Sequence, residues 1–134
     1  MAFAAFTDEL LTGIDLIDAQ HRALFEAVAG LAQAIQDGTS DGDLQVQLAL
    51  IAQRTIFHFH TEEELMKSGQ YPGRSLHGAE HLDLILKVRE IQYRSAKGQS
   101  VTFEITRFLA DWFGRHIASL DMDYATYTRS EVPA

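Results

Sequence analysis

The residues that end helices are concentrated in three short stretches of this 134-residue chain. Residues 37–42 (DGTSDG), 69–73 (GQYPG) and 97–100 (KGQS) combine glycine, proline and polar side chains that favour turns. Outside these stretches the sequence has only one further proline, Pro133. The long segments between the stretches are therefore free to form helices of many turns.

Apolar residues recur in the long segments at spacings of three and four, which is the pattern of an amphipathic helix. Asp15 or Asp18 can cap the start of the first helix, and Ser75 can cap the start of the third. The four predicted helices span about 15–36, about 43–67, about 75–96 and about 101 to beyond 120.

Each predicted helix carries an apolar stripe that can be buried against its neighbours. In chain order, the stripes comprise Leu24, Val28, Leu31 and Ile35; Leu44, Leu48, Ile51 and Thr55 or Ile56; Leu82, Ile85, Leu86 and Val88; and Phe103, Ile105, Phe108, Leu109, Trp112, Phe113, Ile117 and Leu120. Short connections suit neighbouring antiparallel helices, and no segment keeps the period of two that is typical of strands. The sequence therefore predicts an all-α fold, an antiparallel up-down-up-down four-helix bundle, as a single domain over residues 1–134.

The composition excludes several kinds of site and partner. Because the chain contains no cysteine, thiolate zinc sites, iron–sulfur clusters and cysteine nucleophiles are excluded. A formal net charge of −8 without a Lys/Arg cluster disfavours nucleic acid as a partner. The sequence shows neither a secretory signal nor an apolar run long enough to span a membrane, so we expect a cytoplasmic protein without a membrane partner. No protein partner is indicated.

Two pairs of side chains have the spacing of metal ligands on a helix. His77 and His81 are four residues apart, which places them about 40° apart around a helix and about 6 Å apart along it. His58 and Glu62 have the same spacing on the preceding helix. Either pair can reach one metal ion, although the histidine pair alone is equally compatible with coincidence.

Two further histidines lie on apolar stripes, His21 on the first helix and His116 on the fourth, and Asp121 follows His116 by five residues. A lone inward histidine is commonly a hydrogen-bonded core residue. Five imidazoles and two carboxylates buried without partners, however, would cost several kcal/mol each, which a domain of roughly 5–15 kcal/mol total stability cannot tolerate. The set therefore predicts metal ions in the middle of the bundle.

Polar residues next to the expected ligands are predicted to have solvent-exposed side chains. His60 lies about 200° around the helix from His58 and should face outward. Glu63 and Glu64 lack the four-residue spacing from His58, so we expect solvated side chains rather than ligands.

The interval from His116 to Asp121 demands an irregular helix. Five residues correspond to about 500°, which leaves the two side chains roughly 140° apart on a regular α-helix. A π-bulge or a break would return both to one face, so we expect an irregular hydrogen-bond ladder between Arg115 and Met122.

These residues give the chain a resemblance to the hemerythrin family, particularly its bacterial single-domain form. The resemblance covers about residues 13 to 124 and rests on five motifs: GIDLIDAQH (13–21), HFHTEEELM (58–66), YP (71–72), HGAEH (77–81) and WFGRHIASLD (112–121).

The resemblance implies two non-haem iron ions (Fe2+/Fe3+) with a bridging hydroxide or oxide. One iron would be held by His77, His81 and His116, the other by His21 and His58, with Glu62 and Asp121 bridging them. It also implies reversible binding of molecular oxygen at an open position on the second iron, for oxygen storage, delivery or scavenging, rather than catalysis.

Apolar residues beside the expected ligands should wall the oxygen pocket on the second iron: Leu24, Phe59, Trp112, Phe113 and Ile117. Phe113 stands where the family usually has leucine, so the oxygen kinetics are expected to differ. Phe6 stands where the family often has tryptophan, which should affect packing only.

Two other functions remain open at this point. The first is a di-iron oxidase or peroxidase of the ferritin-like type, although that architecture uses Glu-x-x-His pairs and the sequence has none. The second is an oxygen-sensing module that acts on a partner.

Overall fold

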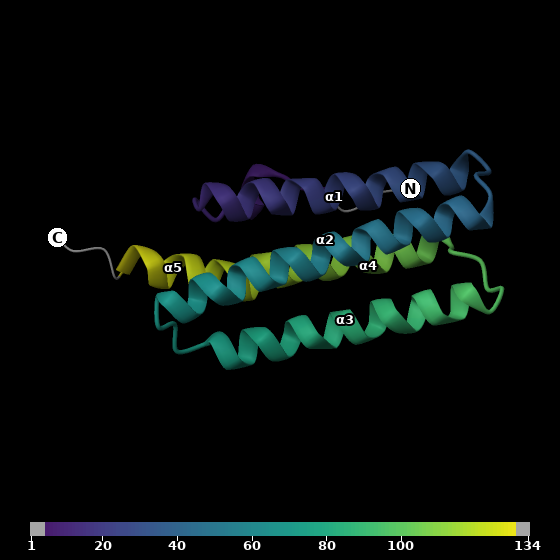
Figure 1. Cartoon of the computed structure of the whole chain (residues 1–134). Helices are drawn as coiled ribbons and strands as arrows, with labels where there is room; N and C mark the ends of the chain where they lie inside the picture. Colours follow the sequence, from purple (N-terminus) through teal and green to yellow (C-terminus); the bar gives the residue numbers. More distant parts are fainter. Residues whose placement is uncertain (1–4, 131–134) are drawn as a thin grey trace.

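The computed structural model describes residues 5–130, which form a bundle of long helices with no strand among them (Figure 1). A short 3-10 turn, η1 (Asp8–Leu10), precedes the bundle. The four long stretches are α1 (Asp15–Gln36), α2 (Asp41–Ser68), α3 (Arg74–Ala96), and α4 (Phe103–His116) continued through η2 (Ile117–Asp121) into α5 (Met122–Ser130). The predicted all-α class and four-helix bundle are confirmed. Pro133 and both ends of the predicted domain 1–134 lie outside the described residues.

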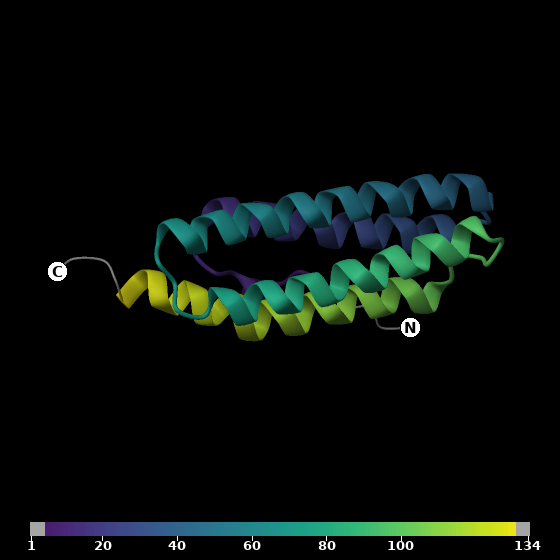
Figure 2. The ribbon, with the colours of Figure 1, turned by 60° about the horizontal axis from the view of Figure 1, so that its bottom comes forward.

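Successive helices run in opposite directions, as their short connections require (Figure 1). α1 packs against α2 and α4, and α2 packs against α3. Figure 2 shows the same bundle turned, with α3 alongside the α4 stretch. Of the helices in the described part, none is both long and apolar enough to cross a membrane.

Two of the predicted helix starts are set by other residues. Ser40 caps α2 by accepting a hydrogen bond from the Asp43 amide at 3.3 Å, so α2 begins at Asp41, two residues earlier than predicted. The N-cap of α3 is Gly73, and Ser75 lies inside the helix, so the predicted cap at Ser75 is wrong.

The start of α1 also differs from the prediction, because its N-cap is Ile14. The carboxylate of Asp18 accepts hydrogen bonds from the Thr12 amide and hydroxyl, both at 2.8 Å, and from the Gly13 amide at 3.1 Å. Gly13 has a φ of 85°, which L-residues with side chains rarely adopt. Asp18 thus holds the turn before α1 rather than capping the helix.

The core of α3 differs from the predicted stripe. Leu84 and Val88 are buried, whereas Leu82 and Leu86 are 55% and 57% exposed. His77 and His81 occupy the two preceding turns of the buried stripe, at the same spacing of three and four residues. Because these polar side chains are buried, the apolar residues alone indicated the wrong face. On α2 the structure resolves the open alternative in favour of Thr55, since Ile56 is 38% exposed.

This difference on α3 predicts unequal effects of two leucine truncations. Leu84→Ala should lower the free energy of unfolding by about 2–5 kcal/mol, because it leaves a cavity in the core. Leu82→Ala removes the same atoms from an exposed position and should change it by about 0.5 kcal/mol or less. Urea denaturation measures both. Equal losses in the two variants would contradict the observed orientation of α3.

Candidate metal centre

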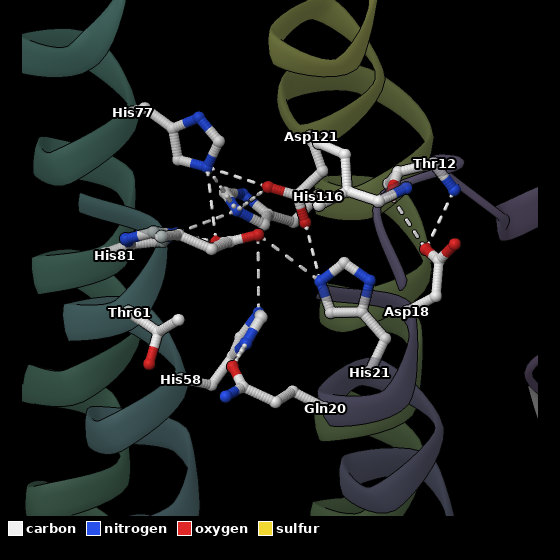
Figure 3. A network of polar contacts seen from close by, with 12 residues as sticks. Thr12, Asp18, Gln20, His21, His58, Thr61, His77, His81, His116 and Asp121 are labelled. Atoms are coloured by element: carbon white, nitrogen blue, oxygen red, sulfur yellow. Dashed lines mark hydrogen bonds and ion pairs between the residues drawn. The ribbon is translucent and has the colours of Figure 1, made fainter. Parts of the chain in front are cut away.

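Seven buried side chains from the four long helical stretches meet in one cluster. The three-histidine group, His77, His81 and His116, lies on one side of two carboxylates, Glu62 and Asp121. The two-histidine group, His21 and His58, lies on the other. Within each group the ligand atoms, together with those of both carboxylates, lie within 4.8 Å of one another. The structure thus brings together all seven of the side chains that the sequence singled out as ligands. Figure 3 labels all of them except Glu62.

The cluster lies closer to the turn between α2 and α3 than to the opposite end of the bundle. His77 follows the first residue of α3, Arg74, by three positions, whereas Ala96 at the other end of the helix follows His81 by fifteen positions. The predicted meeting of the seven side chains inside the bundle is confirmed, although the cluster is offset along α3 toward the turn between α2 and α3. The depth of the site is set by the connection between α2 and α3, which brings residue 62 close to residue 77.

Each carboxylate directs its two oxygens to different histidine groups. Asp121 Oδ1 lies 2.8 Å from His77 Nε2, whereas Asp121 Oδ2 lies 3.0 Å from His21 Nε2. Glu62 Oε1 lies 3.1 Å from His81 Nε2, whereas Glu62 Oε2 lies 3.4 Å from His21 Nε2. Figure 3 shows Asp121 between His77 on one helix and His21 on another. This is the arrangement that two bridging carboxylates require.

The fourth long stretch is irregular where the sequence predicted. Residues Ile117–Asp121 form a π-helix between the regular helices α4 and α5. The wider turn places both His116 and Asp121 in the interior, where each is at most 3% exposed. Asp121 Oδ1 lies 3.3 Å from His116 Nε2. The predicted irregular ladder between Arg115 and Met122 is confirmed.

Three polar residues that the sequence did not assign to the site hold histidine rings. His58 Nδ1 donates to Gln20 Oε1 at 2.6 Å. Glu63 and Glu80 accept in the same way from His81 and His116. Glu63 was expected only to be solvated. Gln20 was noted only as a position of the motif at 13–21, and Glu80 was given no role. Each is the direct sequence neighbour of a predicted ligand, which was the one signal available.

The unpaired atoms of the cluster favour bound cations. In residues 5–130, the buried side-chain atoms without a hydrogen-bond partner all belong to it: His21 Nδ1 and Nε2, Glu62 Oε1, His77 Nδ1, and Asp121 Oδ1 and Oδ2. Although His21 Nε2 lies 3.0 Å from Asp121, the approach lacks hydrogen-bond geometry. Each unpaired atom costs about 1–3 kcal/mol. Cations bound through Nε2 and carboxylate oxygens would pair four of these six atoms.

The electrostatics of the cluster also suit positive charge. Burial lowers the pKa of His21 and of His77, but contacts with Asp121 and Glu62 outweigh burial and raise both pKa values to about 9. Burial raises the pKa of the Glu62 and Asp121 carboxyls, but contacts with the surrounding histidines hold both pKa values below their usual range. Glu62 and Asp121 are therefore ionised at neutral pH although both are buried. Nitrogen and oxygen donors without sulfur suit iron, zinc or manganese.

Comparison with known proteins agrees with this donor set. The family model described as "Hemerythrin HHE cation binding domain" matches residues 12–127. The chain belongs to the hemerythrin family. It is 31% identical to a bacteriohemerythrin of Stenotrophomonas maltophilia (strain R551-3), over 98% of this chain and 86% of that protein. It is 26% identical to a myohemerythrin of Riftia pachyptila, over 87% of each chain. A solved wild-type hemerythrin superposes with a TM-score of 0.87 at 28% identity, covering 93% of this chain and 97% of that one.

Two of the five apolar residues expected to wall an oxygen pocket on the second iron contact rings of the three-histidine group. The Phe59 ring stacks on His81, with centroids 3.7 Å apart and an angle of 3°. The half-buried Trp112 ring stacks on His116, with centroids 4.6 Å apart and an angle of 15°. Leu24, Phe113 and Ile117 are each at most 2% exposed and belong to the main core.

Proposed function

We propose that this chain binds molecular oxygen reversibly at two non-haem iron ions joined by a hydroxide or oxide bridge, for oxygen storage, delivery or scavenging. The observation that carries the proposal is the pair of donor groups that share Glu62 and Asp121. When bound, the iron pair supplies the electrons through which oxygen is held and released. Membership of the hemerythrin family supports the same function.

The donor count supports unequal coordination of the two ions. The three-histidine group and the two carboxylates offer five donors to one ion, and the two-histidine group and the same carboxylates offer four to the other. A single oxygen shared by both ions would raise the count to six donors for the first ion and five for the second. We therefore assign the open position to the ion beside His21 and His58.

We propose that apolar side chains around this position limit the access of water to it. Leu24, Phe113 and Ile117 present only apolar atoms and are almost fully buried. An apolar, water-free pocket disfavours charge separation and proton transfer, which promote irreversible oxidation of iron. We propose that Leu24, Phe59, Trp112, Phe113 and Ile117 together form the pocket that protects the iron pair.

Binding is favoured over turnover by the side chains present. Five histidines and only two carboxylates surround the proposed ions. Ferritin-like di-iron proteins provide more anionic groups, a glutamate from each of two helices and a Glu-x-x-His pair from each of the other two. We therefore propose a carrier rather than an oxidase.

The test is an anaerobic loading experiment. The purified chain is loaded with ferrous iron, its metal content is measured, and its optical spectrum is recorded in oxygen and again after argon flushing. We expect two irons per chain, a new absorption in oxygen and its disappearance under argon. Fewer than two irons, or oxidation that argon does not reverse, would overturn the proposal.

Phe113 is expected to control oxygen entry rather than metal content. Its ring lies in the core beside Phe25, with centroids 6.3 Å apart, and beside Trp112, at 5.7 Å. Phe113→Leu should change the rate of oxygen association or of autoxidation severalfold, because it opens space beside the pocket, while iron remains at two per chain. Stopped-flow absorbance measures the rates. Phe108→Leu, eight residues from His116 on the same helix, is the control that should leave them unchanged. Loss of iron from the Phe113 variant would assign that ring a structural role instead.

A further inference from the structure

Three histidines of the cluster share one supporting arrangement. Each donates its Nδ1 hydrogen to an acceptor on the helix that precedes its own. His58 on α2 donates to Gln20 on α1 at 2.6 Å. The same relation links α3 to α2 and α4 to α3, through two glutamates: His81 donates to Glu63 Oε2 at 2.8 Å, and His116 donates to Glu80 Oε1 at 2.6 Å.

These bonds direct the opposite nitrogen of each ring to the cluster. A neutral imidazole that donates from Nδ1 carries a lone pair on Nε2. His81 and His116 both donate from Nδ1, and their Nε2 atoms lie 3.0 Å apart. Lone pairs at this separation repel one another unless a cation lies between them, so the acceptors orient the rings for metal binding.

The acceptors are distributed unequally between the two groups. Both carboxylate acceptors, Glu63 and Glu80, support rings of the three-histidine group. The two-histidine group has only the neutral amide of Gln20, since His21 Nδ1 has no partner in the described part of the chain. One ion therefore faces rings polarised by two negative charges, and the other faces rings polarised by none.

The carboxylates of Glu63 and Glu80 are partly exposed to solvent. The side chains of Glu63 and Glu80 are 45% and 39% exposed, although the rings that they contact are buried. Water therefore solvates one part of each carboxylate while one oxygen accepts the Nδ1 hydrogen. A carboxylate in this position makes the imidazole a stronger donor and favours the higher charge on the metal.

We infer that Glu63 and Glu80 are positioning residues that make the ion of the three-histidine group the more tightly held and the more easily oxidised of the two. Gln20, which is neutral, keeps the ion beside His58 the more easily reduced. The inference rests on the proposed two-iron function, and it goes beyond that function by assigning the two ions different properties through residues that do not touch them.

The experiment replaces charge while keeping the acceptor oxygen. Glu63→Gln, Glu80→Gln and the double variant retain an oxygen for the Nδ1 hydrogen, so the rings keep their orientation and only the negative charge is lost. Glu64→Gln is the matched control, because Glu64 is exposed and follows Glu63 directly. The reciprocal variant, Gln20→Glu, adds a charge beside His58.

Two readouts are measured, one on the iron-loaded protein and one on the apoprotein. Redox titration under argon gives the midpoint potentials of the two iron ions, and competition with a chelator gives the affinity of the apoprotein for Co2+. We expect the Glu63→Gln and Glu80→Gln variants to raise the midpoint potential of the ion of the three-histidine group. They should also lower the affinity of the apoprotein for Co2+ about 10- to 100-fold. Gln20→Glu should lower the midpoint potential of the ion beside His58 and bring the potentials of the two ions closer together.

The inference would be overturned if Glu63→Gln and Glu80→Gln had the same potentials and Co2+ affinities as the control Glu64→Gln. Unchanged potentials in Gln20→Glu would also overturn it. Because Co2+ binding requires neither iron redox chemistry nor oxygen, it tests the supporting residues on its own. A wild-type chain that takes up two metal ions but fails to bind oxygen would contradict the proposed function and leave this inference standing.

Discussion

Asp121→Asn is expected to reduce the iron content from two ions per chain to one or fewer. The Asp121 carboxylate spans the histidine groups, with one oxygen 2.8 Å from His77 Nε2 and the other 3.0 Å from His21 Nε2. Asparagine keeps the shape but offers a single neutral oxygen, so it cannot bridge two cations. Iron analysis of the variant after loading and desalting gives the result.

The same substitution should destabilise the chain in chelator. Removing one member of a buried ion pair leaves an uncompensated charge, at a cost of about 3–5 kcal/mol. Asp123→Asn is the matched control, since Asp123 lies two residues away on the same stretch and is exposed. An Asp121 variant that retains two irons against a chelator, as the Asp123 variant should, would show that the bridge is not needed.

The positions of the clustered side chains could be predicted because helix geometry leaves few choices. Side chains four residues apart must share a face, so His77 with His81 and His58 with Glu62 were placed together before the fold was known. The irregular helix around residues 117–121 could be predicted because five residues do not bring two side chains to the same face of a regular helix. His116 and Asp121 could share a site only if the helix departed from its regular period.

The face that α3 buries could not be predicted from apolar residues. Hydrophobic periodicity assumes that the buried stripe is apolar, but His77 and His81 occupy that stripe on the first turns of α3. The remaining leucines, Leu82 and Leu86, then gave the stripe a false position, because each is two residues, and therefore about 160° around the helix, from Leu84. The pattern fails at functional sites, because there the core contains polar groups.

The supporting acceptors were missed for a different reason. Each of the bonds from His58, His81 and His116 joins two helices, so it depends on how the helices are rotated against each other. Sequence spacing describes one helix at a time. Gln20, Glu63 and Glu80 therefore looked like ordinary surface residues until the bundle was assembled.

In chelator, the chain is expected to lose stability as the pH rises from about 6.5 to about 9. Burial alone would lower the pKa values of His21 and His77, but contacts with Asp121 and Glu62 raise both from 6.5 to about 9 in the folded chain. A raised histidine pKa stabilises the fold fully below the unfolded pKa, and this stabilisation is lost as the pH passes through the folded pKa. The total loss is on the order of several kcal/mol, because a tenfold change in proton affinity corresponds to about 1.4 kcal/mol.

The carboxylates act at the opposite end of the pH range. The pKa values of Glu62 and Asp121 are lowered in the folded chain, so their stabilisation is present above their usual pKa and is lost in acid. The metal-free chain should therefore be most stable between about pH 4.5 and 6.5.

With metal bound, the chain should not lose stability as the pH rises from about 6.5 to about 9, as the metal-free chain should. Metal takes the place of the protons on His21 and His77, so its affinity should rise with pH up to about 9, and binding near pH 7.5 should release about two protons. Thermal unfolding from pH 5 to 9.5, with chelator and with metal, measures both trends.

His77→Asn should reduce the pH dependence of stability in chelator, whereas His60→Gln, on an exposed position of α2, should leave it unchanged. A chelator-treated chain whose stability rises from pH 6.5 to 9 would show that these histidines are neutral in the folded state, and the release of protons on metal binding would then not occur.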